Sequence, residues 1–143
     1  MNIERMNELL GLLYRIEGIE HGAEKKFSAL ELIEIYEGND RWPDFARNTI
    51  EKAGDLFEPA CLILDADFHE SNGNIHKLHE VTERFKKNLK AIFDYMCPKF
   101  SLRMFSPSYR KYRKNAKIAM NVLCIVVSDG YVKRRWEEAK RSF

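Results

Sequence analysis

Carboxylate and imidazole side chains, the groups that most often bind metal ions or transfer protons, gather in one stretch of the sequence. The group follows an apolar run and continues past a turn, and it consists of Asp65, Asp67, His69, Glu70, His76 and His79. In a strand Asp65, Asp67 and His69 would point the same way, whereas in a helix Asp67 would leave that face. Because no second motif of fixed spacing accompanies them, we interpret them as solvated surface and expect no metal or other cofactor. A metal held by Asp65, Asp67 and His69 is the alternative.

A second pair of candidate residues is Arg15 and His21, which stand in an Arg-x5-His spacing. This spacing resembles the Arg-x4–6-His element of HEPN-type ribonucleases, which are helical, of similar size and often dimeric. The resemblance implies RNA cleavage that uses Arg15 and His21. The chain has no Gly-rich phosphate loop, Cys-x2-Cys, Gly-x-Ser-x-Gly or His-Glu-x-x-His motif. We therefore predict a protein that is not an enzyme, and we rank a small HEPN-like ribonuclease behind two binding functions.

The charge of the chain is divided between its two halves. Residues 1–72 hold 16 acidic against 7 basic side chains, and residues 73–143 hold 6 acidic against 17 basic ones, although the formal net charge is only +2. A basic half attracts polyanions, and an acidic half attracts cations or basic surfaces. The division therefore predicts a charged partner.

Basic residues concentrate in a segment, 95–128, that contains no acidic residue. Several fall on one stripe of a predicted helix whose N-terminus adds partial positive charge, and an exposed tyrosine among them could stack on a base. We predict that this half contacts the phosphates of RNA or DNA with little sequence preference. The candidate nucleic-acid-binding residues are Arg103, Tyr109, Arg110, Arg113, Lys114, Lys117, Lys133 and Arg134.

The alternative function is a protein-interaction module whose acidic helices dock on a basic partner. Such a protein would act as an inhibitor or adaptor, or two copies would pair their complementary halves in a homodimer. The candidate protein-binding residues are Glu31, Glu34, Glu37, Asp40 and Asp44. An ordinary acidic helix surface explains the same pattern, so charge alone does not separate the alternatives.

The cysteine residues and the N-terminal sequence indicate the cellular compartment of the protein. Cys61, Cys97 and Cys124 are odd in number and have apolar neighbours, which favours buried, reduced thiols. The first residues include acid and no apolar stretch typical of a signal peptide. The longest mostly apolar run, 118–127, is too short to span a bilayer. We therefore expect a cytoplasmic protein without a membrane partner.

The elements that must position these residues are mainly helical, because apolar residues recur with helical spacing along most of the chain. The predicted helices span residues 3–17, 28–37, 43–57, 75–96, 106–128 and 132–139. Ser28 and Glu31 form a capping box, Pro43 and Pro107 suit the first turn of a helix, and Pro98 ends one.

The run 60–68 is ambiguous, since a short apolar run suits a buried strand as well as a buried helix. From 143 residues with 45% hydrophobic content we predict a single domain, 1–143, that forms an all-α, compact bundle of five or six helices. The alternative is an α+β fold with a small sheet made of residues 60–66, 100–105 and 121–127.

Overall fold

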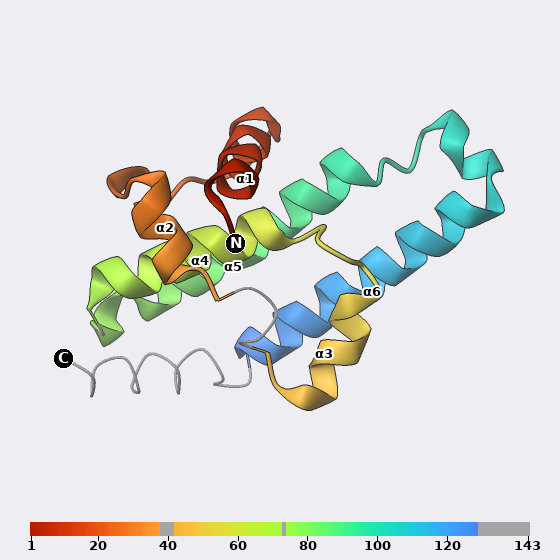
Figure 1. Cartoon of the computed structure of the whole chain (residues 1–143). Coiled ribbons are helices and arrows are strands. Elements are labelled where there is room, and N and C mark those ends of the chain that lie inside the picture. Colours follow the sequence, from red (N-terminus) through yellow and green to blue (C-terminus); the bar gives the residue numbers. More distant parts are fainter. Residues whose placement is uncertain (38–41, 73, 129–143) are drawn as a thin grey trace.

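The computed structural model describes residues 1–37, 42–72 and 74–128, and all regular secondary structure in these ranges is helical (Figure 1). The α-helices are α1 (Ile3–Arg15), α2 (Ala29–Ile35), α3 (Asp44–Glu51), α4 (Glu58–Ser71), α5 (Leu78–Met96) and α6 (Pro107–Ser128). Short 3₁₀ helices, labelled η, are η1 (Ala23–Lys26), η3 (Ile75–Lys77) and η4 (Leu102–Phe105). The six α-helices of these ranges confirm the predicted all-α bundle. The predicted helix 132–139 lies outside the described residues.

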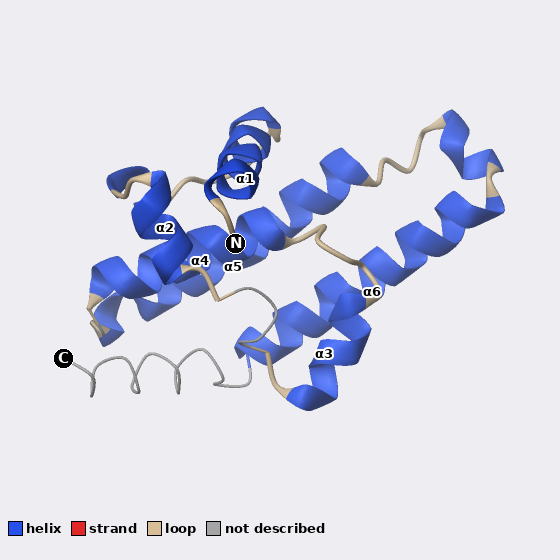
Figure 2. Cartoon of the chain, viewed as in Figure 1, coloured by secondary structure: helices blue, strands red, loops and turns tan. Residues whose placement is uncertain are grey.

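The alternative small sheet is wrong, because Figure 2 shows helices and loops but no strand in the described ranges. Residues 60–66 belong to α4, residues 102–105 form the short turn η4, and residues 121–127 belong to α6. Within the same ranges, no helix is both long enough and apolar enough to cross a lipid bilayer.

The helix α4 is the centre of the molecule, and it is buried on two opposite sides. One side, with Cys61 and Leu64, joins the larger core that α3, α5 and α6 complete. The other side, with Leu62 and Ile63, joins a smaller core made with α1 and α2. Because almost every residue of its first half is buried, α4 shows little of the apolar–polar alternation that identifies a surface helix.

Two antiparallel hairpins build the larger core. The helix α4 turns back into α5, which lies alongside it, and α5 turns back through η4 into α6 (Figure 1). The helix α3 packs on the C-terminal part of α6, and Trp42, which precedes α3, stacks on Phe85 of α5 with ring centres 5.9 Å apart. The turn between α5 and α6 projects beyond the other helices (Figure 1).

Local signals set several helix boundaries as predicted. The capping box is present: the Glu31 N–H donates to Ser28 Oγ over 3.2 Å, and the Ser28 N–H donates to Glu31 Oε1 over 3.0 Å. The helix α6 begins at Pro107, as predicted. The helix α3 is shorter than expected, because Pro43 caps it from outside and it ends at Glu51, where turns replace it.

Candidate nucleic-acid interface

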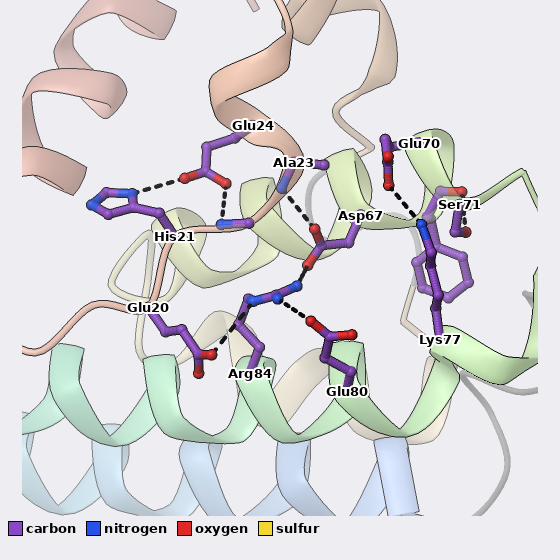
Figure 3. Close-up of polar contacts among 12 residues, drawn as sticks. Glu20, His21, Ala23, Glu24, Asp67, Glu70, Ser71, Lys77, Glu80 and Arg84 are labelled. Carbon is purple, nitrogen blue, oxygen red and sulfur yellow. Dashed lines mark hydrogen bonds and ion pairs between the residues drawn. The ribbon is translucent and has the colours of Figure 1, made fainter.

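A buried polar network ties the loop between α1 and α2 to the central helices (Figure 3). Its hub is Asp67 of α4, which is 5% exposed and accepts hydrogen bonds from the Ala23 N–H at 2.8 Å and from Arg84 Nη1 at 2.7 Å. Arg84 also contacts Glu80 at 2.9 Å and lies 4.0 Å from Glu20. Burial raises the pKa of the Asp67 carboxyl, although the hydrogen bonds from Ala23 and Arg84 oppose this change.

A second buried carboxylate holds His21 in the same loop. Glu24 accepts a hydrogen bond from the Gly22 N–H at 2.8 Å and lies 2.8 Å from His21 Nδ1 (Figure 3). Tyr14 stacks on the imidazole. Arg15 is exposed in the last turn of α1, and in the described part of the chain no hydrogen bond joins it to His21. Among the described residues, the two members of the Arg-x5-His spacing are therefore not joined by a hydrogen bond.

A cavity of about 290 Å³ opens beside this network. Its charges are already paired: Lys26 and Lys77 lie 2.8 and 3.6 Å from Glu70, and Arg84 is held by Asp67. With Glu20 and Glu24 adjoining, carboxylates outnumber cations, so the cavity is a poor site for a polyanion. The network is a structural connection between the loop and the helices.

The residues that the sequence suggested for a metal site have other partners. The Asp65 carboxylate accepts a hydrogen bond from the Glu37 N–H at 3.1 Å, Asp67 binds Arg84, and the His69 ring packs against Phe27. Across the three described ranges, no three His, Cys, Asp or Glu side chains are placed to hold a metal ion together. The expectation that Asp65 and Asp67 are solvated surface is wrong, because both are buried.

The cations of the acid-free segment behave differently. We call residues 95–117, which comprise the end of α5, η4 and the first half of α6, the basic hairpin. Six of its cations are exposed, and among the described residues none of the six forms an ion pair with a carboxylate. These six are Lys99, Arg103, Arg110, Lys111, Lys114 and Lys117. They form the largest set of uncompensated positive charge in the described ranges.

Two of the predicted binding residues instead close the basic hairpin. Tyr109 is only 8% exposed, and its hydroxyl donates to the Pro98 carbonyl at 2.9 Å. Arg113 Nε donates to the Cys97 carbonyl at 3.1 Å, and its guanidinium lies 5.0 Å from the centre of the Phe93 ring. The expectation that Tyr109 presents its ring to a base is therefore wrong, since the ring is covered and the hydroxyl joins the two arms.

Three apolar side chains that are exposed at the turn were not among the residues predicted from the sequence. Phe100, Leu102 and Phe105 are 96%, 85% and 82% exposed, respectively. A usable signal was present: Pro98 follows one helix and Pro107 begins the next, so the two prolines bracket a loop in which apolar residues lack a helix face to bury.

The remaining predicted residues are spread over the molecule or lie outside the described ranges. Glu31 and Glu34 are exposed on α2, which packs on α1 and α4, whereas Asp44 lies on α3, which packs on α6, and is 3.3 Å from Arg47. The hydrogen bonds with Ser28 lower the pKa of Glu31. Glu37 is also exposed, and its N–H donates a hydrogen bond to Asp65 of α4. Three predicted binding residues lie outside the described residues: Asp40, Lys133 and Arg134.

Comparison with known proteins gave no similarity from which to infer a family. The chain matches no protein-family model, no curated protein and no solved structure. Its function is therefore inferred from the charges, the exposure and the contacts of its own residues.

Proposed function

We propose that the protein binds RNA or DNA through the basic hairpin, without strong sequence preference and without catalysing a reaction. The observation that carries the proposal is the set of six exposed cations of the hairpin, none of which is ion-paired within the described residues. Free cations gain most from a polyanion, because binding releases the counterions that are condensed on it. In contrast, the cations around the cavity already have carboxylate partners.

The arrangement of the cations also supports a long, thin ligand. Arg110, Lys114 and Lys117 lie three or four residues apart on one stripe of α6, and they extend over about 10 Å at 1.5 Å per residue. Lys99 and Arg103 continue the positive charge around the turn. If all six cations contact phosphates, log Kobs falls with log salt at a slope of about −5 for duplex DNA and about −4 for single strands.

The test is binding of labelled RNA and DNA across a salt series by two variants that each lose three positive charges. The first variant removes hairpin charges with Arg110→Gln, Lys114→Gln and Lys117→Gln. The matched control removes exposed cations of the acidic half, namely Arg15, Lys25 and Lys52, by the same change to Gln. We expect the salt slope of the hairpin variant to become shallower by about 3, since each phosphate contact contributes about 1, and that of the control to stay unchanged.

Three results would each contradict a part of the proposal. Equal weakening by both variants would mean that only bulk charge matters. An absence of binding at 50 mM salt would mean that an acidic protein or a second copy of the chain neutralises the positive charge. This result would support the protein-interaction alternative. RNA that is cleaved by the wild type but stays intact with His21→Ala would contradict the absence of catalysis.

A further inference from the structure

The turn of the basic hairpin exposes more apolar surface than the turn of a helical hairpin needs. Phe100, Leu102 and Phe105 occur within six residues, and each is more than four-fifths exposed. Single exposed apolar residues are ordinary on a protein surface, but a group of them indicates a binding site. The turn projects beyond the other helices (Figure 1), and the exposure of these side chains shows that no described element covers them.

The turn that carries these side chains is held by hydrogen bonds. The Arg103 N–H donates to Ser101 Oγ at 3.2 Å, and the Met104 N–H donates to the Ser101 carbonyl at 3.0 Å. Tyr109 and Arg113 fasten the two arms of the hairpin behind it. A turn that is already ordered loses little conformational entropy when a ligand binds, so the exposed rings are available at low cost.

The surroundings of the rings define the chemistry of the ligand. The basic hairpin contains no acidic residue, and Arg103 stands between Phe100 and Phe105 in the sequence. The ligand must therefore combine negative charge with flat apolar faces. Unpaired nucleotides have both, because every base has a π-face and every linkage carries a phosphate. In a duplex the base faces are stacked on one another, and only the phosphates and groove edges are accessible.

We infer that the ligand of the basic hairpin is single-stranded RNA or DNA, with Phe100 and Phe105 stacking on unpaired bases. This inference rests on the proposed function and narrows its substrate class. The stripe from Arg110 to Lys117 binds the phosphates of the strand as it leaves the turn. A linear stripe along a helix fits a linear polyanion better than it fits a planar bilayer, which would reach the turn but not the far end of the stripe.

The experiment compares a single-stranded oligonucleotide of about 12 residues with its duplex, using the wild type, Phe100→Ala and Phe105→Ala. Stacking on one aromatic ring is worth enough that each change should weaken single-strand binding by about 5-fold or more, while duplex binding stays unchanged. Leu102→Ala is the matched control at the same turn, because leucine has no π-face. Phe45→Ala, on α3, is the control for loss of an exposed phenylalanine elsewhere, since Phe45 is also exposed.

The same variants are measured on vesicles that contain phosphatidylserine. We expect the exposed cations to give weak, salt-sensitive binding that Phe100→Ala, Leu102→Ala and Phe105→Ala leave unchanged. Vesicle binding that is lost in Leu102→Ala and in both phenylalanine variants, with single-strand affinity unaltered, would overturn the inference in favour of a membrane surface. Equal affinity of the wild type for both nucleic acids, with silent phenylalanine variants, would overturn the inference but leave the proposed function standing. An absence of binding to any nucleic acid would overturn both.

Discussion

Replacing Asp67 by alanine tests whether the polar network fastens the loop between α1 and α2. The change removes the acceptor of the Ala23 N–H and of Arg84 Nη1. The Arg84 side chain is only 12% exposed, and its Nε already lacks a hydrogen-bond partner within the described residues. Breaking a buried ion pair from one side costs about 3–5 kcal/mol. Because Glu80 still neutralises part of the guanidinium charge, we expect the lower end, a loss of about 3 kcal/mol in the free energy of unfolding.

A double variant separates the cost of the orphaned cation from the value of the pair. Burial raises the pKa of Asp67 against the effect of its hydrogen bonds, so holding the carboxylate ionised in the core is itself unfavourable. Replacing both members of a buried ion pair with apolar groups often leaves the stability nearly unchanged. Asp67→Ala combined with Arg84→Met should therefore lose less stability than the sum of the two single changes, by about 1–3 kcal/mol.

The assay is urea unfolding at pH 7, followed by circular dichroism of the helices. The matched control is Asp94→Ala, which removes an aspartate that is paired with Lys90 at 3.0 Å, where both side chains are more than half exposed. Exposed pairs of this kind contribute about 0.3–0.5 kcal/mol. The reasoning is refuted if Asp67→Ala costs no more than Asp94→Ala, or if the double variant loses the full sum.

Three further predictions follow from other contacts. A Cβ on Gly22 would come closer than 3.0 Å to the buried carboxylate of Asp67, so Gly22→Ala should lower the urea midpoint of unfolding. A Cβ on Gly11 meets nothing within 4 Å, so the control Gly11→Ala should stabilise α1 by about 0.5–1 kcal/mol. Tyr109→Phe should cost about 1 kcal/mol of stability in thermal unfolding and leave nucleic-acid affinity unchanged, and a drop in affinity would show that the hydroxyl contacts the ligand. The hydrogen bond from Lys26 lowers the pKa of Glu70 below its ordinary value of 4.5. The stability that this contact contributes is therefore complete above pH 4.5 and is lost as the pH falls through the lowered pKa. The pKa of the Glu70 carboxyl, measured by NMR, should therefore rise in Lys26→Gln. An unchanged pKa would contradict the contact between Lys26 and Glu70.

The sequence predicted best those helices that have one buried face. The helices α5 and α6 alternate apolar and polar residues with the helical period, and Ser28 and Glu31 mark the start of α2 through contacts only three residues apart. The helix α4 could not be identified in this way, because α1 and α2 cover one of its sides and α5 covers another. Its burial depends on tertiary packing, which a period in the sequence does not record.

The candidate site was predictable where it depends on charge alone. The exposed cations follow directly from an acid-free segment, since lysine and arginine remain on the surface unless they are paired. The role of Tyr109 was not predictable, because its burial depends on closure of the hairpin onto Pro98, 11 residues away. The polar network escaped detection for a similar reason: Ala23 and Asp67 are 44 residues apart, and neither belongs to a local motif.

The charges of the described residues are separated along the molecule, which gives this part of the chain an electric dipole. The uncompensated cations lie at the end of the α5–α6 hairpin, and the acidic α2 lies toward the opposite end of the molecule (Figure 1). In the field of a polyanion a dipole experiences a torque, which turns the positive end forward before any contact forms and raises the fraction of productive encounters. The negative end is repelled by the same strand. Under the proposed function, copies bound along one strand would therefore stand with the same polarity, hairpin inward and α2, with its exposed Glu31 and Glu34, outward.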